Sequence, residues 1–150
     1  MMRYGTRPVE ILLVEDSPSD AAFAIEAFRT AGAGADNRLI HVEDGVKALA
    51  YLRREGPFSG AARPDLVLLD LNLPKKDGRE VLADVKADPD LATIPVIVLT
   101  TSHSDKDVNQ SYKLHANCYI VKPVDFTHFT QVIESMKNFW LNVATLPGNA

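Results

Sequence analysis

Five short apolar runs alternate along the chain with longer segments that carry helical patterns. The runs cover residues 11–14, 39–42, 66–69, 96–99 and 119–121. The first, third and fourth runs are continuously hydrophobic, as expected of strands that helices cover on both faces. His41 interrupts the second run, which indicates a strand nearer an edge of the sheet. The pattern predicts five strands, each followed by a helix.

The segments between the runs contain residues that typically begin and end helices. Ser17 and Pro18 predict an N-cap and a first helical position, Asp20 completes a capping box, and Gly32 can end that helix. Apolar positions at helical spacing mark three further helices: Val46, Leu49 and Leu52, ended by Gly56-Pro57; Val81, Leu82 and Val85, begun by an Asp77-Gly78 turn and closed before Pro89; and Phe126, Phe129, Val132, Ile133, Met136 and Trp140. A helix near 104–114 has few apolar positions and should pack loosely.

Strand–helix alternation with right-handed crossovers predicts an α/β fold, a doubly wound five-stranded parallel sheet with helices on both faces. A chain of 150 residues is long enough for one domain. We expect an N-terminal tail over 1–8, the domain over 9–143, a C-terminal tail over 144–150, and no output domain.

Composition narrows the classes of function. Apolar residues make up 46% of the chain and charged residues 24%, and no apolar run approaches the ~20 residues that span a bilayer. The start of the chain has no apolar signal core, and a single cysteine fits a reducing compartment, so a cytoplasmic protein is expected. The net charge of −4 and the absence of a basic cluster argue against nucleic acid as a partner.

Polar residues follow four of the five apolar runs. Glu15 and Asp16 follow the first, Asp70 the third, Thr100 to Ser102 end the fourth, and Lys122 follows the fifth. In open parallel sheets these positions meet at one edge. Crowded carboxylates need a cation, and oxygen ligands suit Mg²⁺. The cation, a lysine and a hydroxyl would hold a phosphoryl group; because the chain has no glycine-rich phosphate loop, a carboxylate is expected to carry that group covalently.

Four sequence motifs resemble those of the response regulator receiver domain. They are Ile-Leu-Leu-Val-Glu15-Asp16, Leu-Val-Leu-Leu-Asp70-Leu-Asn72-Leu-Pro74-Lys-Lys-Asp77-Gly78, Pro95-Val-Ile-Val-Leu-Thr100 and Tyr119-Ile-Val-Lys122-Pro123. Their order and spacing match the family over roughly residues 9 to 140. The resemblance implies the flavodoxin-like (βα)5 receiver fold. It also implies phosphotransfer from a histidine kinase, with the domain catalysing only its own phosphorylation and dephosphorylation.

The same resemblance implies a role for each matching residue. Asp70 would be the phosphoacceptor, assisted by Lys122 and Thr100. Asp16 and Asp70 would bind Mg²⁺ with the backbone carbonyl of Asn72, and Glu15 would act as an outer ligand through water; many members have Asp in place of Glu15. Thr100 and Tyr119 would form the switch, Asn72 and Ser102 would tune the lifetime of the phosphoryl group, and the Lys122–Pro123 bond would be cis.

A narrower resemblance concerns the end of the chain. Asn117-Cys118-Tyr119-Ile120, Phe139-Trp140-Leu141 and Ala144-Thr145-Leu146-Pro147 are similar to segments of small regulators that pair with phytochrome-type histidine kinases. This resemblance implies a bacterial phytochrome as the kinase. Apolar residues beyond the expected end of the sheet favour a homodimer through the fourth helix, fifth strand and fifth helix, with Phe139, Trp140 and Leu146 at the interface.

Two rival functions use a similar strand-end chemistry. A phosphatase of the haloacid dehalogenase type also has an Asp nucleophile and Mg²⁺, but it needs a second Asp where this chain has Asn72, and a cap over its substrate. A flavodoxin-type cofactor binder needs a phosphate loop that the first turn lacks. Turnover of a free phosphate ester or a flavin spectrum would reveal either one.

Overall fold

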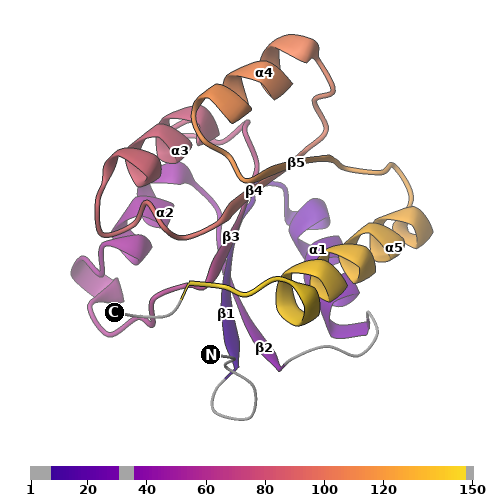
Figure 1. The fold of residues 1–150 in the computed structure, drawn as a ribbon, viewed down its shortest axis with the longest axis horizontal. Helices are drawn as coiled ribbons and strands as arrows, with labels where there is room; N and C mark the ends of the chain where they lie inside the picture. The colour runs from indigo at the N-terminus through magenta and orange to yellow at the C-terminus, as the bar shows by residue number, and fades with distance from the viewer. Residues whose placement is uncertain (1–7, 31–35, 148–150) are drawn as a thin grey trace.

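The sheet has the predicted parallel topology. The computed structural model describes residues 8–30 and 36–147, and these form one five-stranded sheet in the order β2-β1-β3-β4-β5 (Figure 1). The strands are β1 (Val9–Val14), β2 (Asn37–Val42), β3 (Leu66–Leu69), β4 (Val96–Thr100) and β5 (Cys118–Val121). Each predicted run lies within a strand, and β2 is an edge strand, as His41 indicated.

The register of the strands brings the predicted site together. Val14 pairs with Leu69, so Asp70 directly follows the end of β3 beside the end of β1, and its amide donates to the Val14 carbonyl at 3.1 Å. Thr100 pairs with Val121, and the amide of Lys122 donates to the Thr100 carbonyl at 2.7 Å. The carboxyl ends of β1, β3, β4 and β5 therefore meet at one edge of the sheet.

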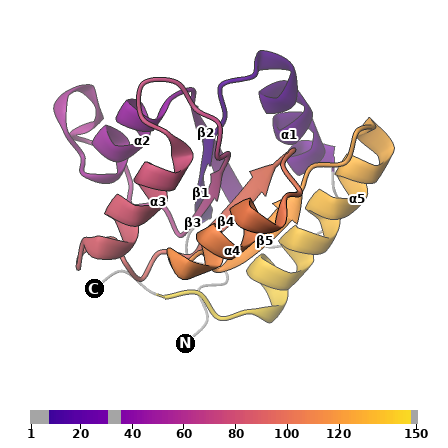
Figure 2. The same cartoon turned by 90° about the horizontal axis from the view of Figure 1, so that it is seen from above.

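Helices cover both faces of the sheet. They are α1 (Pro18–Thr30), α2 (Gly45–Leu52), α3 (Gly78–Ala87), α4 (Asp105–Lys113) and α5 (Phe126–Lys137). Helices α1 and α5 lie side by side on one face, and α2 and α3 cover the other, with α4 next to β5 (Figure 2). Alternate side chains of each strand reach opposite faces: Leu12 packs with α2 and α3, whereas Leu13 packs with α1 and α5.

The ends of the first two helices differ in part from the expectation. Ser17 caps α1 by accepting from the Asp20 amide at 3.2 Å, as predicted, while the expected stop at Gly32 lies outside the described residues. Helix α2 ends at Leu52, earlier than predicted. The backbone turns at Arg54, which has φ +56°, and Gly56 then begins a short 3-10 turn (Gly56–Phe58) in place of ending α2.

The fourth and fifth helices differ in how they are held. Only Ser111 of α4 is buried, so the prediction of a loosely packed helix is confirmed. Helix α5 buries Phe129, Ile133 and Met136 and continues as a π-helical segment (Asn138–Val143), which the Ala144 amide closes by donating to the Phe139 carbonyl at 2.7 Å. No helix in the described ranges is long and apolar enough to cross a membrane.

Candidate functional site

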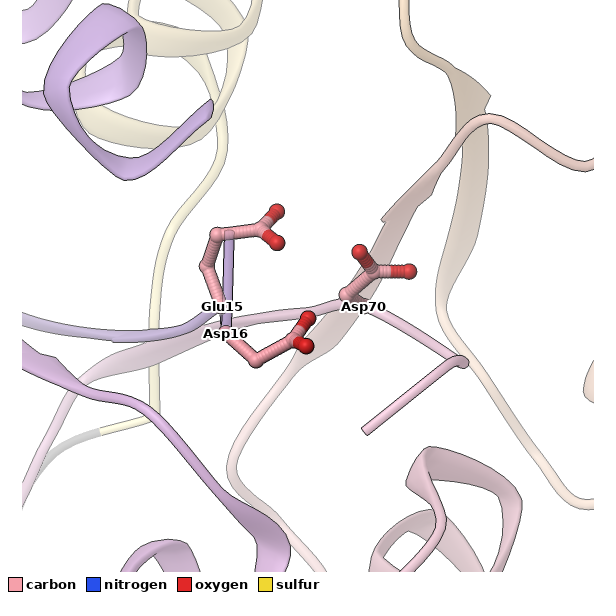
Figure 3. A group of neighbouring side chains, drawn as sticks. All are labelled: Glu15, Asp16 and Asp70. Atoms are coloured by element: carbon pink, nitrogen blue, oxygen red, sulfur yellow. The ribbon is translucent and has the colours of Figure 1, made fainter. Parts of the chain in front are cut away.

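Three carboxylates meet where β1 and β3 end. Glu15 and Asp16 directly follow β1, and Asp70 directly follows β3 (Figure 3). One oxygen from each of the three lies within 4.8 Å of the others. Glu15 and Asp70 are buried, whereas Asp16 is exposed. Three converging oxygens at this separation fit a hard divalent cation, because such a cation takes carboxylate ligands and offsets their mutual repulsion.

Lys122 supplies positive charge within the same cluster. Its Nζ donates to a Glu15 carboxylate oxygen, to Asp20 Oδ2 at 2.8 Å and to Asp70 Oδ2 at 3.0 Å. The lysine is 7% exposed, so these three acidic partners replace its water. The structure thus joins Lys122 to Asp70, as the sequence predicted.

Asp20 is a member of the site that the sequence reasoning missed. Its local pattern assigned it to a capping box, but its carboxylate reaches Lys122 and not the Ser17 amide, which donates to Glu15 Oε2 at 3.1 Å. The available signal was its place in the first turn of α1, next to the carboxyl end of β1. The capping-box prediction is therefore wrong for its acidic half.

The bond between Lys122 and Pro123 is trans, since the described residues contain no cis peptide bond. The cis bond implied by the resemblance is therefore contradicted here. A trans bond is the ordinary preference before proline, by ~0.5–1 kcal/mol. The Lys122 ammonium reaches Glu15, Asp20 and Asp70 from this backbone.

Burial and crowding set the proton affinities of the cluster. Burial, with the charge of Asp70 added, raises the pKa of Glu15 to about 7, although its hydrogen bond to Lys122 acts in the opposite direction. Burial alone would lower the pKa of Lys122, but hydrogen bonds to Asp20 and Glu15 and the charge of Asp70 raise it above its ordinary value. The lysine stays charged, and the carboxylates exceed it in number. The cluster therefore has an excess of negative charge that a cation would neutralise.

The other side of the site, at the ends of β4 and β5, consists of hydroxyl groups. Thr100 is fully buried, and its Oγ1 has no hydrogen-bond partner among the described residues. The Tyr119 hydroxyl donates to the Ser102 carbonyl at 2.8 Å. An unpaired buried hydroxyl is costly, so an acceptor within reach of Thr100 would stabilise this side of the site.

A polar link that the sequence did not reveal ties this side to the helices. Ser102 Oγ donates to Asp107 Oδ2 at 2.6 Å, and Arg79 donates to Asp107 Oδ1 at 2.8 Å. Burial opposes the high pKa of Arg79, but its hydrogen bonds to Asp107 and Asp77 raise it further. Arg79 is 28 residues from Asp107 in the sequence, and no local motif marks the pair. The N-terminus of α4 is thus attached to α3 by charge and hydrogen bonds.

Asn72 and Asp77, in the segment that follows Asp70, both hold the backbone of that segment. The amide of Asn72 donates to Asp70 Oδ1 at 3.3 Å, which holds the loop after β3 against the carboxylate. Asp77 caps α3 in a capping box with Glu80, confirming the predicted turn into that helix. The assignment of the Asn72 carbonyl to the metal, and of Asn72 and Ser102 to lifetime control, stay predictions.

An apolar groove lies between β5, α5 and the π-helical segment that follows α5. Its volume is about 650 Å³, and its lining includes Cys118 and Ile120 of β5, Val132 and Met136 of α5, and Phe139. Phe139 is exposed. Trp140 and Leu146 are partly buried against the α1–α5 side of the core. Of the residues proposed for a dimer, Phe139 and Trp140 line the groove, whereas Leu146 is not among its lining residues.

Comparison with known proteins places this geometry in a family. The model of the response regulator receiver domain matches residues 11–134. Response regulator Rcp1 of Synechocystis sp. is 49% identical over 140 residues, which cover 93% of this chain and 94% of that protein. The structure of the phosphorylated cyanobacterial phytochrome response regulator RcpA has a TM-score of 0.89 and 48% identity, covering 95% of this chain and all of that one. The Mn²⁺-bound form of Rcp1 gives a TM-score of 0.88 at 48% identity, covering 94% and 100%.

Proposed function

Because the chain belongs to the response regulator receiver domain family, we propose that it is a phosphorylation switch in which a histidine kinase transfers a phosphoryl group to Asp70. The observation that carries this proposal is the cluster around Asp70. A buried carboxylate at the end of β3 lies with two further acids and a buried lysine, and a threonine with an unpaired buried hydroxyl ends the neighbouring strand β4. That set suits a group with three negative oxygens and a carboxylate nucleophile.

In the proposed reaction, an Asp70 oxygen attacks the phosphorus of a phosphohistidine in line. The new P–O bond forms as the P–N bond breaks, and the histidine nitrogen leaves with its electron pair. Lys122, 3.0 Å from Asp70 Oδ2, pairs with one phosphoryl oxygen. Thr100 donates its hydroxyl to another. Hydrolysis by water later returns Asp70 to its free form, so the domain acts only on its own phosphoryl group.

A divalent cation belongs to the same proposal. Asp16, Asp70 and the Asn72 carbonyl would hold Mg²⁺, with Glu15 bound through water. The bound ion supplies positive charge that offsets the phosphoryl oxygens. Glu15 is only 3% exposed, and its ion pair with Lys122 holds its carboxylate in place beside the proposed ion.

The proposed signal is a change at α4, β5 and α5. The phosphoryl group adds charge and acceptor oxygens beside Thr100. As Thr100 turns toward it, Tyr119 gives up its bond to Ser102 and repacks inward, and the lightly packed α4 adjusts. The similarity to RcpA and Rcp1 supports a phytochrome-type kinase as the partner. We place the protein in the cytoplasm and the domain at residues 9–143.

The central test is phosphorylation by a small phosphodonor with Mg²⁺. We expect one acid-stable, base-labile phosphoryl group on the wild-type protein and none on Asp70→Asn. Asp90→Asn, which changes an exposed aspartate, serves as the control and should label like the wild type. Labelling of Asp70→Asn at the wild-type level would overturn the assignment.

We further propose a homodimer through the α4–β5–α5 surface. β5 is an edge strand, α4 buries only Ser111, and the groove beside Phe139 is apolar, so a second copy would cover surface that is costly to expose. Analytical ultracentrifugation should show a dimer that Phe139→Ala weakens. Val46→Ala, which changes an equally exposed apolar residue on α2, should leave it intact. A monomer at high micromolar concentration, with and without a phosphoryl mimic, would exclude the dimer.

A further inference from the structure

The loop between β3 and α3, residues 71–77, has a strained backbone. It begins directly after Asp70 and contains Asn72. Within it, the amide of Lys76 donates to the Pro74 carbonyl at 2.7 Å, and Lys75 between them has φ +67°. A three-residue turn with positive φ is unfavourable for a residue with a side chain. The surroundings of the loop must therefore hold it in this conformation.

Gly45, the first residue of α2, provides the surface on which the loop rests. A β-carbon at Gly45 would lie 2.0 Å from the Lys76 carbonyl oxygen and 2.8 Å from its carbon. The obstacle is backbone and not the end of a flexible side chain, so it cannot turn aside. With any other residue at position 45, either the loop or the start of α2 would have to move.

The same end of α2 contacts the loop a second time. Asp44 is buried and caps α2 by accepting from the Lys47 amide at 2.7 Å. Its other carboxylate oxygen lies 3.8 Å from Lys75 Nζ. Two successive residues of α2's start therefore face two successive residues of the strained turn.

Gly78 fixes the far end of the loop. Its amide donates to the Leu71 carbonyl at 2.9 Å, and a β-carbon there would lie 2.1 Å from the Asp70 carbonyl oxygen. The loop thus contacts the end of β3 through Gly78 and contacts the start of α2 through Lys75 and Lys76. A β-carbon at Gly78 would meet the backbone of Asp70 itself, whereas the three atoms nearest to a β-carbon at Gly45 all belong to Lys76. Gly45 is therefore the residue whose effect on the site must pass through the loop.

We infer that Gly45 is a positioning residue for the phosphorylation site. By letting the loop rest directly on α2, it fixes the path of residues 71–77, and with it the Asn72 carbonyl and the amide that bonds to Asp70. This inference rests on the proposed function, since it assumes that Asp70 and Asn72 hold Mg²⁺. It assigns a role to a residue in α2, which otherwise contributes nothing to the site.

The test is the affinity for Mg²⁺ alone, measured by calorimetry on the full chain. Gly45→Ala should bind Mg²⁺ about tenfold more weakly, the scale expected when a support of a metal ligand is disturbed. The matched control is Gly60→Ala, because a β-carbon at Gly60 meets nothing within 4 Å; its affinity should equal that of the wild type. The unfolding temperature of each variant, measured without metal, shows whether a change in Mg²⁺ affinity comes with a loss of overall stability.

A second variant keeps the test decisive if Gly45→Ala does not fold. In Gly45→Ala/Lys75→Gly, glycine occupies the φ +67° position, so the loop can yield to the added methyl group at little cost. We expect this double variant to fold and still to bind Mg²⁺ weakly.

The outcomes separate this inference from the proposed function. A wild-type protein that neither binds Mg²⁺ nor takes up a phosphoryl group overturns the proposed function. A wild-type protein that does both, with wild-type Mg²⁺ affinity in a folded Gly45→Ala or in the double variant, overturns only the inference about Gly45. A lowered unfolding temperature with unchanged affinity does so as well, because it shows a purely structural role.

Discussion

The two sides of the site are built from different interactions. The acidic half, at the ends of β1 and β3, consists of Glu15, Asp16, Asp20 and Asp70 around Lys122, and its buried charges are paired with one another. The hydroxyl half, at the ends of β4 and β5, consists of Thr100, Ser102 and Tyr119. Thr100 has a buried hydroxyl without a described partner, Tyr119 donates to a backbone carbonyl, and Ser102 donates to Asp107.

The helices that follow Asp70 and Thr100 differ in how much apolar surface they bury. Helix α3, which follows Asp70, buries Val81, Leu82 and Val85, whereas α4, which follows Thr100, buries only Ser111 and depends on Asp107 for its attachment. Apolar packing resists displacement, while hydrogen bonds can be exchanged for others at small cost. The acidic half thus adjoins the more firmly packed helix, and the hydroxyl half adjoins the helix that can move more easily, as the proposed switch requires.

Removing the lysine should produce the largest effect, in the acidic half. Lys122→Met leaves buried carboxylates facing one another, so we expect the metal-free protein to lose about 3–5 kcal/mol of unfolding free energy at pH 8. Added Mg²⁺ should restore much of this loss. Urea unfolding with and without Mg²⁺ measures both.

Lys86→Met is the matched control for this change. Lys86 is also partly buried, but its hydrogen-bond partners among residues 8–30 and 36–147 are the Ala92 and Ile94 carbonyls and Asn117 Oδ1. Its replacement leaves no unpaired carboxylate, so Mg²⁺ should not rescue it. Equal rescue of both variants would show that Lys122 does not balance the acidic cluster.

The second effect is a pH dependence in the same half. The folded-state pKa of Glu15 is about 7, above its ordinary value of 4.5. The metal-free folded protein therefore holds this proton more tightly than the unfolded chain, and the resulting stability is full below about pH 4.5 and is lost as the pH rises through 7. The loss should be roughly 3 kcal/mol.

Glu15→Gln isolates that contribution. Urea unfolding of the variant and the wild type between pH 4.5 and 8 should show a difference that grows with pH. Mg²⁺ affinity should change in the opposite direction, strengthening from pH 6 to 8, because the metal requires the ionised carboxyl. A constant difference in stability across this range would contradict the buried, protonated state of Glu15.

A smaller effect is expected in the hydroxyl half. Thr100→Val removes a buried hydroxyl that has no described partner, so the unphosphorylated protein should gain about 1 kcal/mol of unfolding free energy. The neighbouring exposed residue gives the control Thr101→Val, which should change little. Because Thr100 is proposed to donate to the phosphoryl group, the variant should also fail to change α4 on phosphorylation. A loss of stability in Thr100→Val would show that the hydroxyl is satisfied.

The smallest effect concerns the link from α3 to α4. Asp107→Asn removes the ion pair with Arg79, which should cost only about 0.5 kcal/mol. Hydrogen exchange should nevertheless become faster at the N-terminus of α4 and stay unchanged in α3. Asp105→Asn, in the same helical turn but exposed, should leave both unchanged. Equally faster hydrogen exchange in α3 and α4 would show that α4 is not held less firmly than α3.

The sequence predicted the features that depend on local pattern or on chain topology. Continuous apolar runs identified β1, β3 and β4, and parallel topology then required Asp70 and Lys122 to meet. Features that depend on tertiary contacts were not accessible. Asp20 has an ordinary capping position, and only the fold turns its carboxylate toward Lys122. The Arg79–Asp107 pair and the close approach of Gly45 to the Lys76 backbone likewise join segments that are distant in the sequence. No hydrophobic period or local motif predicts such contacts.

The groove beside β5 also contains Cys118, the only cysteine of the chain. Burial raises the pKa of this thiol, so little of it is thiolate at neutral pH and its reaction with thiol reagents should be slow. The rate of that reaction then depends on how accessible the groove is. A single natural thiol therefore offers a chemical reporter for this surface, one that needs no engineered label. Its modification rate, followed against protein concentration and phosphorylation, would record when the groove becomes covered and when it opens.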